Sequence, residues 1–122
     1  MKRILVIALA ILTLFSAAVS AQDTIEQQKI EFLLSSVENL REAKFIRNGS
    51  EHDGKEAAEH LRSKLKSAGG KVKNADDFIR LCASRSIISG KYYTIRLSDG
   101  RIIGSEQYFR EKLREYNMED KR

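Results

Sequence analysis

Two stretches near the start of the chain place apolar residues three and four positions apart, the spacing of an amphipathic helix. The first runs from Asp23 to about Ala43. Its apolar stripe consists of Ile30, Leu33, Leu34, Val37 and Leu40. The second follows Asp53, which pairs as a capping residue with Glu56 three positions later, and it ends at Gly69-Gly70. We expect both stripes to face the core.

Two further helices are predicted closer to the C-terminus. One begins after Asn74, with Asp76 and Asp77 in its first turn, where negative charge stabilises the helix dipole. We expect this helix to end before Ser89-Gly90. The other is predicted to be capped by Ser105, and its apolar residues are Phe109, Leu113 and Tyr116. The charged tail from about residue 117 is expected to fray.

The segment that joins the first two helices has the signals of a short β-hairpin. Phe45-Ile46-Arg47 is strand-like, and the return strand would be Ser50-Glu51-His52. Between them, Asn48-Gly49 is a strong signal for a two-residue turn, because both residues tolerate positive φ. The same residues begin a glycosylation sequon, but the turn explains them better.

A second hairpin is predicted from Lys91 to Ile103. Tyr93, Ile95 and Leu97 alternate with Tyr92, Thr94 and Arg96, as in a half-buried strand. If Asp99-Gly100 is a two-residue turn, Leu97 lies opposite Ile102 and both side chains point inward. The element order is therefore α-ββ-α-α-ββ-α. The predicted fold class is α+β, with about four helices packed on two short antiparallel β-hairpins.

The first 21 residues have the pattern of an export signal. Lys2 and Arg3 precede an apolar stretch from Ile4 to about Val19, and Val19-Ser20-Ala21 fits a cleavage site before Gln22. The apolar stretch is shorter than a typical membrane span. We expect cleavage, a periplasmic protein with no stable membrane insertion, and a single domain over residues 22–122. An uncleaved N-terminal anchor is the alternative.

The charge balance argues against a nucleic-acid partner. The 122 residues include 22 Lys and Arg against 17 Asp and Glu, and the two signs are interspersed. Nucleic-acid binders usually concentrate their basic residues on one face or arm. The hydrophobic content of 42% is ordinary for a folded protein and too high for a disordered one.

Several short strings carry a resemblance to a known family. They are FIRNG at residues 45–49, EAAxHLRxK at 56–64, DDFI at 76–79 and YxIRxxDG at 93–100. The chain resembles a family of small exported proteins of Gram-negative bacteria that is classed as a domain of unknown function. The resemblance implies a fold and a location, and no reaction. That family commonly has an aromatic residue at the position of His52 and a tryptophan near Tyr108, so this chain departs from it twice.

Few residues offer chemistry, and no disulfide, metal or cofactor is expected. Cys82 is the only cysteine, so the chain has no intramolecular disulfide. The thiol is reactive, intermolecular or buried, and its place beside Phe78 and Ile79 favours burial. His52 and His60 are too few and too irregularly spaced for zinc, which takes three or four ligands. Glycine-rich phosphate-binding motifs do not occur.

Glu56 and His60 lie one helical turn apart, so their side chains can meet. A carboxylate that orients an imidazole occurs in acid–base catalysis, and the pair could serve a small envelope hydrolase. A helix-edge histidine with an i,i+4 partner is the plainer interpretation.

The residues favoured for binding are basic and polar positions in the family-like strings: Arg47, Asn48, Glu56, His60, Arg62 and Arg96. Arginine binds carboxylates and phosphates bidentately, so Arg47 and Arg96 could form a basic face on the hairpins together with His60 and Arg62. The rival interpretation is that Arg47 and Arg96 pair with nearby acidic residues and brace the hairpins.

We therefore predict a non-enzymatic periplasmic binding or protein-interaction module, whose partner is an envelope protein or a small anionic ligand. Two alternatives remain at this point. One is the hydrolase based on Glu56 and His60, and the other is a structural or inhibitory partner of another envelope protein. The second alternative would be favoured by a large exposed apolar patch or by an obligate dimer.

Overall fold

The computed structural model describes residues 23–121, so the predicted export signal over residues 1–21 lies outside the described residues. A helix covers residues 23–38. The other elements are β1 (Lys44–Arg47), β2 (Ser50–His52), α2 (Gly54–Ala68), η1 (Gly69–Lys71), α3 (Ala75–Cys82), β3 (Thr94–Arg96), β4 (Ile102–Gly104) and α4 (Ser105–Asp120). The order and the α+β class agree with the prediction.

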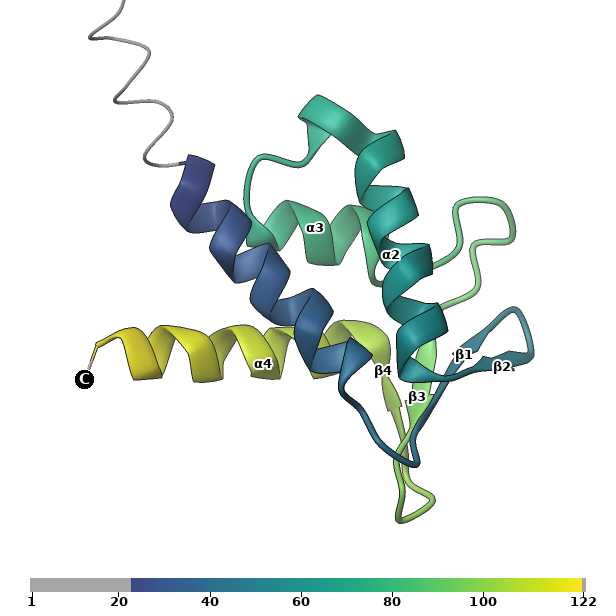
Figure 1. The fold of residues 1–122 in the computed structure, drawn as a ribbon. Coiled ribbons are helices and arrows are strands. Elements are labelled where there is room, and N and C mark those ends of the chain that lie inside the picture. The colour runs from purple at the N-terminus through teal and green to yellow at the C-terminus, as the bar shows by residue number, and fades with distance from the viewer. Residues whose placement is uncertain (1–22, 122) are drawn as a thin grey trace, which may run out of the picture.

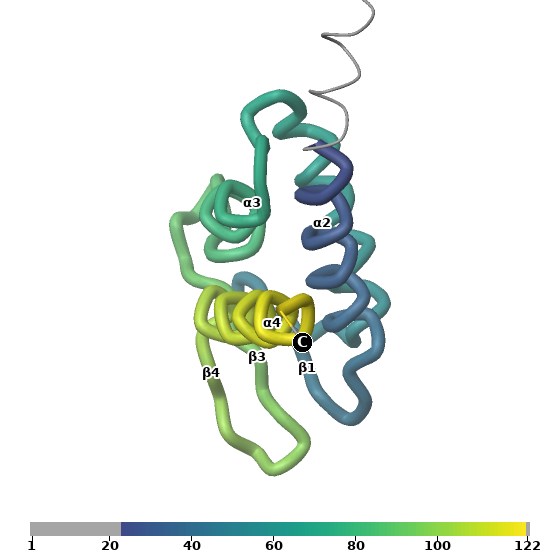
Figure 2. The backbone as a smooth tube through the Cα atoms, turned by 90° about the vertical axis from the view of Figure 1, so that its left-hand side faces the viewer, coloured from purple at the N-terminus to yellow at the C-terminus, as the bar shows by residue number. Residues whose placement is uncertain are grey.

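The two hairpins are parts of one antiparallel sheet with the strand order β2-β1-β3-β4. They join through β1 and β3, where Phe45 lies opposite Ile95. The sheet lies at one end of the molecule, and the helices pack beyond it (Figure 1). Figure 2, which looks along α4, shows α3 on one side and α2 with the N-terminal helix on the other. The sequence predicts each hairpin but not their pairing.

Residues paired across the strands share a face of the sheet. His52, Phe45, Ile95 and Ile103 form one row, and Phe45 and Ile95 are buried, so this row faces the core. Arg96 lies in the outer row between Lys44 and Ile102. Arg47, two residues after Phe45, lies on the inner face.

The first turn is as predicted, with φ of 51° at Asn48 and 80° at Gly49. The second turn is longer than predicted. Arg96 pairs with Ile102, and the Leu97 amide donates to the Arg101 carbonyl oxygen at 2.8 Å. Residues 98–100 therefore form a three-residue loop, which Gly100 closes at φ of 90°. The predicted pairing of Leu97 with Ile102 is wrong by one residue, and Ile102 points to solvent with 60% of its surface exposed.

The first helix is shorter than predicted, and its end packs closely against the start of α2. It ends at residue 38 rather than near Ala43, and Glu42 takes a positive φ of 57° as the chain turns. A Cβ atom on Gly54 would lie 2.3 Å from the Val37 carbonyl oxygen. Only glycine lets the start of α2 lie this close to the end of the first helix.

The capping predictions hold for α2 and α3 and fail for α4. Asp53 Oδ1 accepts from the Glu56 amide, and Asn74 Oδ1 accepts from the Asp77 amide, both at 2.8 Å. Gly69, with φ of 53°, ends α2. Ser105 is a buried residue inside α4, and its hydroxyl donates to the Ala83 carbonyl oxygen at 2.7 Å. It therefore ties α4 to the end of α3 instead of capping α4.

The end of α3 agrees with the prediction and the end of α4 differs from it. α3 ends at Cys82, before Ser89-Gly90. The residues between form a loop that projects beside α2 (Figure 1). α4 stays helical to Asp120, past the point where fraying is expected. Cys82 is buried, as predicted, and burial raises the pKa of its thiol.

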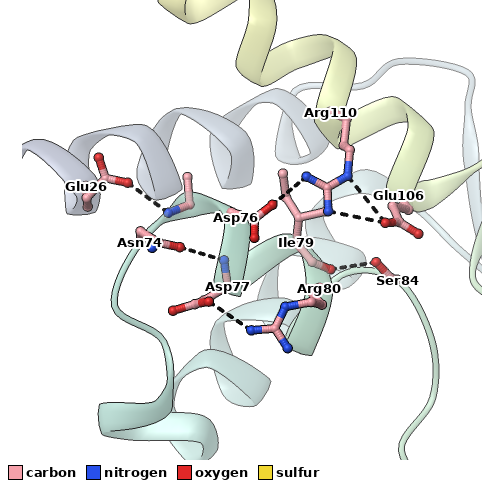
Figure 3. A network of polar contacts seen from close by, with 10 residues as sticks. Glu26, Asn74, Asp76, Asp77, Ile79, Arg80, Ser84, Glu106 and Arg110 are labelled. Carbon is pink, nitrogen blue, oxygen red and sulfur yellow. Dashed lines mark hydrogen bonds and ion pairs between the residues drawn. The ribbon is translucent and has the colours of Figure 1, made fainter.

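A network of polar contacts holds the start of α3 (Figure 3). Glu26 of the first helix accepts from the Ala75 amide at 3.1 Å. Arg110 of α4 donates to Asp76 at 2.7 Å and to Glu106 at 3.3 Å. We call these residues the α3 network. Because its charges come from three helices, it fixes α3 relative to the first helix and α4.

Candidate functional site

An open groove of about 670 Å³ lies between α2 and the loop over residues 86–91. We call it the α2 groove. On the helix side it is lined by His60, Ser63, Lys64 and Ser67, which share one face because they are spaced by three and four positions. The loop side includes Ile87 and Ile88. This site combines a polar helix face with an apolar loop.

Hydrogen bonds within the loop and to the first hairpin hold the loop in place. The Ser86 amide donates to the Lys91 carbonyl oxygen at 2.9 Å, and the Gly90 amide donates to the Ser86 carbonyl oxygen at 3.0 Å. Gly90 allows this turn with φ of 73°. The Ser89 hydroxyl donates to Asn48 Oδ1 at 2.6 Å. Asn48, a predicted binding residue, therefore positions the loop.

Tyr93 and Lys64 connect the loop to α2. Lys64 Nζ donates to the Arg85 carbonyl oxygen at 2.9 Å and to the Tyr93 hydroxyl at 3.0 Å. The same ammonium lies 4.8 Å from the centre of the Tyr93 ring, a cation–π contact. Tyr93 is buried, so this pair forms the inner wall of the groove.

His60 is neutral at physiological pH. Its Nε2 lies 3.4 Å from the Tyr93 hydroxyl. Burial lowers its pKa to about 4, and the positive charges of Arg47 and Lys64 contribute to the same shift. A neutral imidazole beside a hydroxyl adds a polar contact to the groove and no charge.

The charges that line the groove all have one sign. Within the described part of the chain, the groove lining includes no Asp or Glu. Its cationic residues there are Lys64, Lys71, Arg80 and Arg85. Arg80 forms an ion pair with Asp77 at 2.9 Å. Neither Lys71 nor Arg85 has a carboxylate within ion-pair distance among residues 23–121. The groove therefore has two cations available to an anion.

Apolar side chains stand beside these cations at the tip of the loop. Ile87 is 82% exposed and Ile88 is fully exposed. Full burial of an isoleucine side chain is worth about 1.5–3 kcal/mol, so leaving both in water forgoes a substantial gain. Tyr92, at the base of the loop, is 67% exposed. The site offers apolar surface next to unpaired positive charge.

The predicted Glu56–His60 pair does not form. Glu56 Oε2 lies 3.1 Å from His52 Nδ1, and Glu56 is exposed. His60 instead contacts Tyr93 through its Nε2. One helical turn between Glu56 and His60 allows a contact, but the Glu56 carboxylate instead contacts His52 on β2. The geometry on which the hydrolase alternative rests is therefore absent.

The other predicted arginines separate. Arg47 lies on the inner face of the sheet, with Nη2 3.5 Å from His52 Nε2. Arg96 lies on the outer face in an ion pair with Glu51. Arg62 binds Glu31 of the first helix at 2.8 and 2.7 Å, and these hydrogen bonds hold the pKa of Glu31 below its usual range. The rival interpretation, bracing of the hairpins by an acidic partner, holds for Arg96. It does not hold for Arg47, which has no carboxylate partner among residues 23–121.

Sequence reasoning did not single out the loop. Ile87 and Ile88 form an apolar pair that no helical or strand period explains, set between Ser86 and Ser89-Gly90. An apolar pair between turn-forming residues is the sequence signal that could have identified this loop. Arg85 gave no local sign, because its freedom from acidic partners depends on packing.

Two other properties of the described part of the chain bear on function. Across residues 23–121, no three His, Cys, Asp or Glu side chains gather closely enough to hold a metal ion. None of the helices in the same range is both long and apolar enough to cross a membrane.

Comparison with known proteins gives a family and a relative. Residues 24–117 match the model of a family described as "Family of unknown function (DUF5329)". The chain is similar to the "Uncharacterized protein YfeK" of Salmonella typhimurium, with 33% identity over 93 residues, which cover 76% of this chain and 77% of that protein. No solved structure matches the chain significantly.

Proposed function

The chain belongs to the DUF5329 family of unknown function, and we propose that it is a non-enzymatic periplasmic binding module. Its ligand is anionic and carries an apolar group, and it binds in the α2 groove. The observation that carries this proposal is the placement of unpaired Lys71 and Arg85 in the same groove as exposed Ile87 and Ile88.

The electrostatics of the groove favour an anion over a cation or a neutral ligand. Charge-assisted hydrogen bonds to Lys and Arg are about twice as strong as neutral ones. The groove lining has no carboxylate to compete for these two cations. The neutral His60 and the hydroxyls of Ser63 and Ser67 can accept or donate further hydrogen bonds to a polar head.

Three observations support binding without catalysis in the periplasm. His60 contacts Tyr93, and no carboxylate among residues 23–121 orients its ring. Burial raises the pKa of the Cys82 thiol, which disfavours the reactive thiolate. The basic and apolar start of the chain, at residues 2–19, favours export.

The proposal can be tested with two dyes that differ in one charge. 1-Anilinonaphthalene-8-sulfonate carries a sulfonate, and N-phenyl-1-naphthylamine is its uncharged analogue. Both fluoresce when they leave water for an apolar site. We expect saturable binding of the sulfonate with one site per chain, and weaker binding of the uncharged dye.

Variants of the groove cations separate the charge from the apolar surface. Lys71→Gln and Arg85→Gln are each expected to weaken sulfonate binding about fivefold and to leave the uncharged dye unaffected. Lys55→Gln is the matched control, because Lys55 is an exposed residue of α2 outside the groove lining. The proposal is wrong if the three variants bind the sulfonate equally well, or if the two dyes bind with equal affinity.

A further inference from the structure

The loop that closes one side of the α2 groove ends in an apolar tip that projects from the molecule. Ile88 is fully exposed and Ile87 is 82% exposed. In Figure 1 this loop extends away from the helices beside α2. The side chains of the tip are therefore exposed to solvent at the end of a projecting loop.

The tip is held in this exposed position. The Ser86 amide donates to the Lys91 carbonyl oxygen and closes the loop, and Lys64 donates to the carbonyl oxygen of Arg85 at its base. The Ser89 contact to Asn48 ties the loop to the first hairpin. A tip that is already ordered loses little further conformational freedom when it binds, which favours association.

Positive charge surrounds the tip. Arg85 and Lys91 lie on either side of it in the chain, and Lys71 lies across the groove. From residue 78 to residue 98 the chain has no Asp or Glu. Exposed Tyr92 stands at the base of the loop, and tyrosine is enriched where a bilayer meets water. The loop therefore matches an anionic lipid surface in three respects. The aliphatic tip suits the acyl chains, the aromatic base suits the interface, and the flanking cations suit the anionic headgroups.

We propose that Ile87 and Ile88 insert into the surface of an anionic phospholipid bilayer, while Arg85, Lys91 and Lys71 bind the headgroup phosphates. The inference rests on the proposed function, because it names the anionic ligand of the α2 groove as a lipid headgroup. The association is peripheral and reversible, since only one loop enters the bilayer.

The shape of the surface favours a bilayer over a folded protein partner. Stable protein interfaces bury about 800 Å² on each partner and use aromatic or arginine anchors in pockets. A projecting loop with two adjacent isoleucines offers little area of that kind. A bilayer needs no complementary pocket, and anionic lipids attract each nearby Lys or Arg.

Vesicle flotation tests the proposal with the exported protein. The vesicles contain phosphatidylcholine alone or phosphatidylcholine with 40% phosphatidylglycerol. We expect binding to the anionic vesicles, at least tenfold weaker binding to the neutral ones, and release as salt is raised. Ile87→Ser/Ile88→Ser is expected to weaken binding at least tenfold, and Arg85→Gln/Lys91→Gln severalfold.

Ile102→Ser is the matched control, because Ile102 is also an exposed isoleucine but lies on the outer face of the sheet. It is expected to bind as the unsubstituted protein does. All variants are prepared in the same exported form, so they differ only at the substituted residues. Equal binding by the Ile87→Ser/Ile88→Ser variant and the unsubstituted protein would overturn the inference.

A tryptophan placed at the tip gives a second readout. The chain has no tryptophan, so Ile88→Trp emits as a single probe. Its emission is expected to shift to shorter wavelength with anionic vesicles, and that of Ile102→Trp to stay unchanged. An unshifted Ile88→Trp would contradict insertion.

Two outcomes separate this inference from the proposed function. If the sulfonate dye binds in the groove and the vesicles do not bind, the groove proposal stands and the bilayer inference fails. If the unsubstituted protein dimerises with rising concentration and Ile87→Ser/Ile88→Ser stays monomeric without either protein binding vesicles, a second copy covers the tip. That result also overturns the bilayer inference.

Discussion

The α3 network and the α2 groove both contain cationic side chains, but these side chains differ in whether they have carboxylate partners. In the α3 network, Arg110 has two carboxylate partners, Asp76 and Glu106 (Figure 3). In the groove, Lys71 and Arg85 have none among residues 23–121. The comparison shows that some cations of this chain, such as Arg110, pair with carboxylates of neighbouring helices, whereas Lys71 and Arg85 remain available to a ligand.

The backbone shows the same contrast at the two ends of α2. Gly54, at its start, lies against the carbonyl oxygens that end the first helix. Gly70, just after its end, has no atom within 4 Å of the place where a side chain would begin. The start of α2 is therefore tightly packed, whereas the chain just after its end, beside the groove, has free space around it.

The largest expected effect is the loss of stability when a methyl group is added at the start of α2. Gly54→Ala is expected to destabilise the fold by about 3 kcal/mol, because its Cβ would lie 2.3 Å from the Val37 carbonyl oxygen. Gly70→Ala is the matched control and is expected to change stability by less than about 0.5 kcal/mol. Urea unfolding of both variants measures the difference. Similar midpoints would show that the first helix does not pack closely on α2.

The next effect depends on pH. His60 has a pKa of about 4 in the folded chain and about 6.5 when unfolded, so the unfolded chain takes up its proton first as pH falls. Stability is therefore lost between about pH 6.5 and pH 4, and His60 adds no pH dependence above that window. We expect a loss of about 1–2 kcal/mol, because solvent at this half-buried site reduces the 1.36 kcal/mol per pKa unit.

The measurement is the urea midpoint of the unsubstituted protein and of His60→Gln at pH 7 and at pH 4.5. Other groups also titrate in this window, so the difference between the two proteins isolates His60. We expect the unsubstituted protein to lose more stability than the variant. Equal losses would place His60 in water rather than against Tyr93.

The smallest effect compares two arginines directly. Arg110→Met removes the contacts to Asp76 and Glu106 and is expected to cost about 1 kcal/mol, less in high salt, because the ion pairs are half-exposed. Arg85→Met is expected to leave stability within about 0.5 kcal/mol, since Arg85 has no carboxylate partner in the described residues. Equal costs would mean that Arg85 also braces the fold.

Local chemistry made most of the elements predictable. Asp53 and Asn74 cap their helices because a short polar side chain before a helix satisfies amides that the helix leaves free. Asn48-Gly49 forms the expected turn for an equally local reason, since both residues adopt positive φ. The second turn failed because Ser98 joins Asp99 and Gly100 in the loop, and the signal of the last two residues fits either length.

The site was less predictable because it depends on distances between separate elements. Glu51 binds Arg96 across the sheet, and Glu31 binds Arg62 between helices, so two predicted binding residues are taken by partners remote in the sequence. Glu56 has two histidines within reach in the sequence pattern, and only the fold places His52 against it. A periodic pattern predicts which face of an element is buried, but not which charges remain unpaired.

The strand order β2-β1-β3-β4 has a consequence for folding kinetics. Each hairpin closes a short loop, an event of microseconds. Pairing of β1 with β3 instead brings together segments that flank both α2 and α3 in the chain, and such distant contacts slow folding. We expect the pairing of the two hairpins to be the slow step in folding. Its rate is expected to depend on how fast α2 and α3, which lie between β1 and β3 in the chain, fold and pack.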